Sequence, residues 1–80
     1  MKCSVYKGER RQDSYLFVPA EQELSQVPRR LLDMLGNLGF VLTIDLTPTT
    51  KLAQSDPVAV IDNLKTQGYF LQLPPGDPVR

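Results

Sequence analysis

The segment SDPVAVIDNLKTQG at residues 55–68 carries the clearest structural signal in the chain. Asp56 is placed to cap a helix, because its carboxylate can accept a hydrogen bond from a backbone N–H of the first turn. Pro57 fits the first helical position, and Gly68 fits the residue that follows a helix. The apolar side chains recur at helical spacing: Pro57, Val60, Ile61 and Leu64. The segment therefore predicts a short amphipathic helix that buries one face against the rest of the domain.

A second helix is predicted within LSQVPRRLLDMLG at residues 24–36. Its apolar stripe consists of Leu31, Leu32 and Leu35, again at helical spacing. Ser25 or the Val27–Pro28 pair marks its start, because proline is tolerated in the first turn and the residue before it favours an extended backbone. Gly36 sits where a residue with positive φ would end the helix.

Four further segments are typical of β-strands. Residues 2–7 and 14–18 are rich in β-branched or aromatic side chains and flank a polar run, which predicts a hairpin that ends before Pro19. Residues 39–46 form a nearly continuous apolar run, the pattern of a central strand. Residues 69–73 predict a short last strand, and the threonine-rich residues 47–51 predict a turn.

These elements follow the order β-β-α-β-α-β, which predicts an α+β fold. We expect a two-layer sandwich with a mainly antiparallel four-stranded sheet and both helices on one face. The chain has 80 residues, enough for one core only. Residues 1–75 are therefore predicted to be a single domain, and residues 76–80 a flexible C-terminal tail.

The composition excludes several classes of protein. Nine basic and nine acidic side chains cancel, whereas proteins that bind nucleic acids strongly carry a positive excess. The first residues lack the apolar core of a signal peptide, and no stretch is long and apolar enough to span a membrane. The single Cys3 cannot form an internal disulfide. We therefore expect a cytoplasmic protein.

Several short motifs together resemble the bacterial YcgL domain. In chain order they are Tyr15-Leu16-Phe17-Val18, Val27-Pro28, Asp45-Leu46-Thr47, Lys51-Leu52-Ala53, Asp56 and Gly68-Tyr69-Phe70-Leu71-Gln72-Leu73-Pro74-Pro75. The last of these is the most specific, and the match extends over nearly the whole chain. The resemblance implies a small α/β domain of a γ-proteobacterial type in the bacterial cytoplasm. It implies no catalytic residue.

The residues that could carry chemistry are scattered. Cys3 lacks a histidine to generate its thiolate, because the chain contains none, and a core or half-buried structural thiol is expected instead. The carboxylates occur singly, at Asp33, Asp45, Asp56 and Asp62, and favour capping or turn roles over acid–base work or metal binding. We therefore expect no catalytic residue, no metal site and no cofactor.

The aromatic side chains of the predicted strands offer a candidate binding surface. Alternate residues of a strand share a face. If Val5, Leu16 and Val18 face the helices, then Tyr6, Tyr15 and Phe17 face the other way, joined by Phe70 when Leu71 and Leu73 face the core. With both helices on one face, this second face is left open, although it could also be half-buried by the tail or a partner, or stabilised by ring pairs across strands. A slip of one residue would reverse the assignment.

Three functional hypotheses follow. The first is a non-catalytic protein-interaction domain with Tyr6, Tyr15, Phe17 and Phe70 as anchors, which the balanced charge favours. The second is a weak single-stranded RNA module, in which the same rings stack on bases beside Lys7, Arg10, Arg11 and also Lys51. The third is an enzyme of unknown type, which the absence of histidine disfavours.

Overall fold

The computed structural model describes residues 1–10, 14–52 and 55–72 and contains six elements in the predicted order. The strands are β1 (Lys2–Gly8), β2 (Tyr15–Pro19), β3 (Leu38–Asp45) and β4 (Phe70–Gln72). The helices are α1 (Arg29–Leu35) and α2 (Pro57–Thr66). The predicted tail at residues 76–80 lies outside the described residues. Among the described residues, no helix is long and apolar enough to cross a membrane.

Both helices begin and end as their sequences predict. The Asp56 carboxylate accepts a hydrogen bond from the N–H of Val58 at 3.0 Å, and Pro57 opens α2. Pro28 immediately precedes α1, which selects the later of the two predicted starts. Gly36 and Gly68 follow the two helices with φ of 78° and 88°, a backbone conformation that glycine adopts far more readily than other residues.

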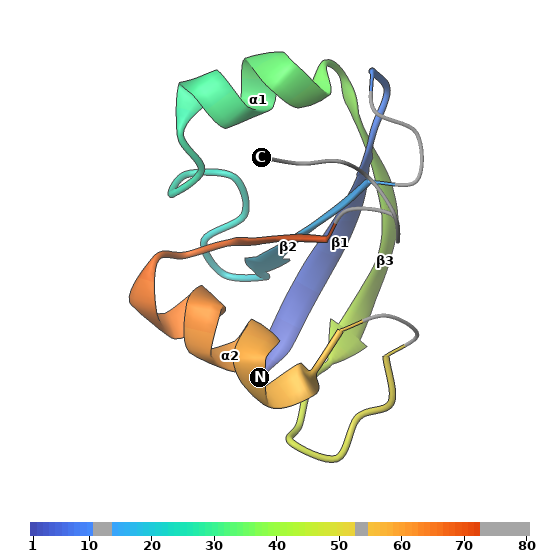
Figure 1. Ribbon diagram of the computed structural model, residues 1–80, viewed down its shortest axis with the longest axis vertical. Helices are drawn as coiled ribbons and strands as arrows, with labels where there is room; N and C mark the ends of the chain where they lie inside the picture. The colour runs from blue at the N-terminus through green and yellow to red at the C-terminus, as the bar shows by residue number, and fades with distance from the viewer. Residues whose placement is uncertain (11–13, 53–54, 73–80) are drawn as a thin grey trace.

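The strands form one antiparallel sheet in the order β3-β1-β2-β4. The predicted hairpin is therefore present, with β1 and β2 in the centre of the sheet (Figure 1). The predicted α+β class and four-stranded sheet are confirmed. The prediction that residues 39–46 form a central strand is wrong, because β3 lies at an edge. An apolar run indicates that a segment forms a strand. Which strands lie beside it depends on the path of the whole chain.

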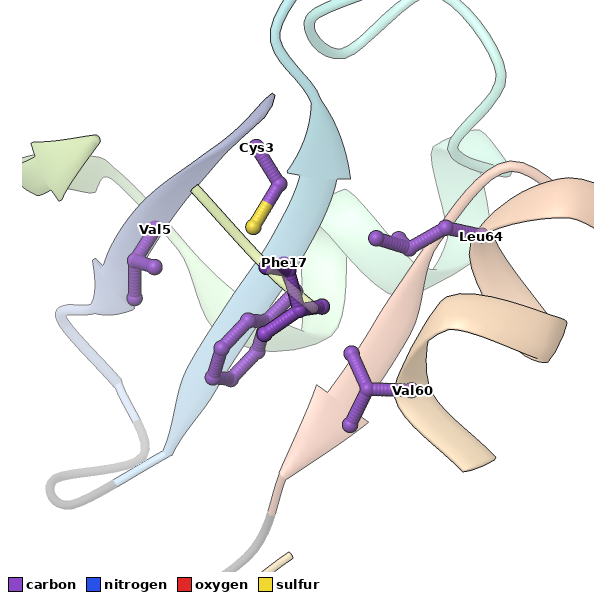
Figure 2. Packing of buried hydrophobic residues seen from close by; sticks show 6 residues of the cluster. Cys3, Val5, Phe17, Val60 and Leu64 are labelled. Carbon is purple, nitrogen blue, oxygen red and sulfur yellow. The ribbon is translucent and has the colours of Figure 1, made fainter. Parts of the chain in front are cut away.

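The two helices pack on opposite faces of the sheet, which corrects the predicted placement of both on one face. Val60 and Leu64 of α2 join a buried cluster with Cys3, Val5 and Phe17 (Figure 2). Leu35 of α1 joins a separate cluster with Leu16, Val18 and Val27. In Figure 1 the orange-red strand β4 passes between α1 above and α2 below. We call these two sides the α2 face and the α1 face.

Candidate functional site

The register of the β1–β2 hairpin decides where the predicted aromatic anchors lie. Val5 is paired with Phe17, and Tyr6 is paired with Leu16. Paired residues of an antiparallel sheet point to the same side. Phe17 therefore shares the α2 face with Val5, whereas Tyr6 lies on the α1 face. The sequence assigned Val5 and Phe17 to opposite faces, and this assignment was wrong by the one-residue slip that a strand pattern leaves undetermined.

Phe17 is a core residue. Its side chain is only 5% exposed and packs against the apolar side chains of α2. Its ring meets the ring of Phe70 edge-on, with 6.0 Å between the centroids. Tyr15 and Phe70 pack against the same cluster and are half-buried. The expected open sheet face is therefore absent from the described part of the chain, because each face carries a helix.

Tyr6 is held on the α1 face by two contacts. Its ring lies edge-on to the ring of Phe40, with 5.8 Å between the centroids. Its hydroxyl donates a short hydrogen bond to a carboxylate oxygen of Glu23. This hydrogen bond, together with partial burial and the negative charge of Glu23, raises the pKa of the Tyr6 phenol. The raised pKa means that the neutral phenol is favoured in the folded protein.

We expect Glu23→Ala to lower the pKa of Tyr6 towards the ordinary tyrosine value of about 10. Because the folded pKa lies above the unfolded one, the stability that this bond contributes is fully present below the unfolded pKa and is lost as pH rises through the folded pKa. The pKa is read from the ring carbon shifts of Tyr6 during an alkaline NMR titration. Glu21→Ala is the matched control and should leave it unchanged. An equal pKa in wild type and Glu23→Ala would contradict the contact.

The basic residues named in the RNA hypothesis do not all lie beside the predicted rings, although Lys7 shares the α2 face with Tyr15. Lys7 is exposed and pairs with Tyr15, while Tyr6 lies on the other face. The side chain of Arg10 crosses Gly36, where an added Cβ would lie 2.6 Å from its Cγ. Lys51 is exposed in the segment that follows β3. Arg11 lies outside the described residues.

The cysteine and the carboxylates that could carry chemistry are buried, occupied in local contacts or exposed singly. Cys3 is fully buried, and burial raises the pKa of its thiol. Asp56 caps α2, and Asp45 ends β3, where its carboxylate lies 3.4 Å from the Met1 ammonium group. Asp33 and Asp62 are exposed on their helices. Within residues 1–10, 14–52 and 55–72, no three histidine, cysteine, aspartate or glutamate residues are grouped as metal ligands would be.

A surface that was not expected from the sequence lies along β3. Phe40, Val41 and Leu42 are exposed by 60%, 44% and 43%, and they follow one another in the chain. No strand of the described residues pairs with the outer side of β3 (Figure 1). A signal was present in the sequence: a helix about 10 Å wide covers about two strands spaced about 4.8 Å apart, so two short helices leave part of a four-stranded sheet bare.

An apolar groove adjoins this strand on the α2 face. Its volume is about 410 Å³, and every described residue that lines it is uncharged: Val5, Tyr15, Phe17, Val41, Leu42, Ile44, Leu52 and Gln72. The buried Val5 and Phe17 contribute to the groove from the central strands, and the exposed Val41 and Leu42 from the edge strand. We call the exposed residues Phe40, Val41 and Leu42 together with this groove the β3 surface. It can bind an apolar side chain, and it offers the backbone of β3 beside it.

The comparisons with known proteins agree on one family. A sequence model of the YcgL domain matches residues 3–75. The chain is 43% identical over 75 residues to a YcgL domain-containing protein of Pseudomonas putida, covering 94% of this chain and 77% of that protein. It is 45% identical over 75 residues to one from Shewanella amazonensis, covering 94% and 82%.

A third relative is much longer. The chain is 45% identical over 71 residues to a protein of Nitrosococcus oceani named a putative HAD-like hydrolase. The match covers 89% of this chain and 19% of that protein. The same domain thus forms a small part of a larger chain.

Proposed function

The chain belongs to the YcgL domain family, and we propose that it is a non-catalytic protein-interaction module of the bacterial cytoplasm that binds its partner along the β3 surface. The supporting observation is the exposed edge strand itself. Its side chains are apolar over three consecutive residues, and its outer backbone groups have no strand beside them in the described part of the chain. An extended peptide can add to such an edge, with backbone hydrogen bonds supplying affinity and a neighbouring pocket supplying specificity.

A protein partner fits this surface better than RNA does. The chain has no net charge, and the groove lining is uncharged. Binding to RNA draws most of its affinity from phosphate contacts and needs rings that are free to stack. Phe17 is buried, and Tyr6 and Tyr15 lie on opposite faces. The RNA alternative would therefore depend on Lys7 and Arg10 and on Arg11, with few rings beside them.

The Nitrosococcus relative gives a second line of support. A domain that occurs both in small proteins and as a fifth or less of a larger one is used as a module. In the larger protein such a domain would act through contacts with neighbouring segments or with other proteins. The β3 surface is one apolar part of the described structure that is free to make them.

The test compares proteins captured by paired variants. Wild type, Leu42→Ser and Val58→Ser are immobilised and exposed to a lysate of the source bacterium. Leu42 lies on the β3 surface and is 43% exposed, while Val58 is an apolar residue of α2 that is 53% exposed, so Val58 serves as the control. We expect a protein that wild type and Val58→Ser retain and that Leu42→Ser loses at least tenfold, because a central interface residue contributes about 2 kcal/mol or more.

That protein is then purified and titrated into the labelled domain by NMR, and shifts should concentrate at residues 38–45. Capture that is the same for all three variants would contradict the proposal. A parallel titration with short mixed RNAs at low salt separates the alternative. Shifts at Lys7 and Arg10 that fade as salt rises would replace the protein partner with RNA.

A further inference from the structure

We infer that β3 pairs with β3 of a second copy of this chain, so that two domains form one continuous eight-stranded antiparallel sheet about a two-fold axis. This inference rests on the proposed function, because it names the occupant of the β3 surface. Three features of β3 support it: an irregularity in its backbone, the open space over Gly39 and the position of its single charge.

The backbone irregularity of β3 favours pairing with a strand that has the same irregularity. Val5 pairs with Leu42, and the next residue of β1, Tyr6, pairs with Phe40, so Val41 is an extra residue in a β-bulge. After this bulge the alternation of β3 changes phase. If a regular strand paired with β3 residue by residue, paired side chains would point to the same face of the sheet on one side of Val41. On the other side of Val41 they would point to opposite faces. Such bulges normally protect edge strands from pairing.

A second copy carries the matching extra residue. When the two-fold axis passes between Val41 and Leu42, each of these residues lies opposite the other in the second copy. The remaining pairs are then Thr43 with Phe40, Ile44 with Gly39, and Asp45 with Leu38. From the β1 partners of these residues, Thr43, Phe40, Asp45 and Leu38 lie on the α1 face, and Leu42, Ile44 and Gly39 lie on the α2 face. Val41 lines the groove of the α2 face together with Leu42. Every pair therefore matches in face.

The side chains of this register are compatible. Ile44 meets Gly39 of the other copy, where a built Cβ has no atom within 4 Å, so there is room for the larger side chain. Asp45 is the only charged residue of β3 and lies opposite Leu38, so the two Asp45 carboxylates are at opposite ends of the paired strands. The centre of the interface is apolar, with Val41 and Leu42 of both copies.

The small area buried between the two β3 strands limits the affinity of the dimer. Pairing through one strand of 8 residues in each copy buries less surface than the about 1,600 Å² of a standard stable interface. We therefore expect a weak dimer whose population rises between micromolar and millimolar protein. Sedimentation velocity over this range should show a shift from monomer to dimer. Isotope-filtered NOEs between labelled and unlabelled copies should join Leu42 to Val41 and Phe40 to Thr43.

Charge substitutions test the register itself. Val41→Glu and Leu42→Lys should each abolish the dimer, whereas Val58→Lys on α2 should leave it intact. An equimolar mixture of the Val41→Glu and Leu42→Lys proteins should restore it, because the inferred register places these two positions opposite each other. Unfolding in urea checks that each variant remains folded.

The outcomes separate this inference from the proposed function. A protein that remains monomeric up to millimolar concentration overturns the dimer, as does a dimer that survives both charge substitutions. A wild type that proves to be a monomer can still capture a protein that the Leu42→Ser variant does not capture. In that case a different protein occupies the β3 surface and the proposed function holds. If neither a dimer nor a captured partner depends on Leu42, both fall.

Discussion

Replacing Phe17 with alanine is expected to lower the free energy of unfolding by about 3–5 kcal/mol, the cost of truncating a buried aromatic side chain. Phe17 is 5% exposed and contributes to the cluster that joins α2 to the sheet. A domain of this size has a total stability of about 5–15 kcal/mol, so the loss is a large part of it. We expect Phe17→Ala to unfold at much lower urea concentration or to be unfolded in buffer.

Phe40→Ala is the matched control, because the same side chain at this position is 60% exposed. We expect it to cost no more than about 1 kcal/mol, as surface substitutions generally do. Urea unfolding followed by circular dichroism gives both values. The reverse ranking, with Phe40→Ala unfolded and Phe17→Ala stable, would show that the faces of the sheet are exchanged.

Gly68→Ala is expected to be the most damaging substitution outside the core. Gly68 has φ of 88°, and holding a non-glycine residue in such a conformation costs about 1–3 kcal/mol. An added Cβ would also lie 2.5 Å from the Cβ of Gln26, an atom next to the backbone that cannot move away as the tip of a side chain can. The cost should therefore exceed that of the backbone alone, and α2 and β4 should lose their relative placement.

Gly39→Ala provides the contrast. Its φ lies outside the positive range, and a built Cβ meets nothing within 4 Å. Replacing a glycine at such a position usually stabilises a protein by about 0.4–1 kcal/mol, because the unfolded chain loses conformational freedom. Thermal unfolding of the two variants beside wild type measures both effects. Equal melting temperatures for the two variants would contradict the backbone geometry at Gly68.

The helices could be predicted closely because their signals are local. Asp56, Pro57 and Gly68 each act on a neighbouring backbone group, and α2 begins and ends beside them. The strands could be found for the same reason, from apolar and β-branched runs. The order of elements followed from these local features, and the mainly antiparallel sheet was predicted from that order.

The β3 surface could not be predicted because it depends on long-range strand pairing. Placing Phe17 on the correct face would have required the register of β1 against β2. The sequence of the two strands does not determine that register. To predict that Phe40 and Leu42 are exposed, one would need to know the strand order. In that order β1 lies between β3 and β2, so β3 is left at the edge of the sheet. Only the half-buried Tyr15 and the buried Phe17 of the predicted anchors line the groove that the structure shows.

The sheet separates the two buried clusters, and this division governs how the domain tolerates change. Val60 lies in the cluster of the α2 face and Leu35 in that of the α1 face, with no shared cluster neighbour. Free-energy effects of substitutions without common partners add, whereas those within one cluster are coupled. A change under one helix therefore calls for compensation under the same helix only. The two sides of this small domain can diverge in sequence independently.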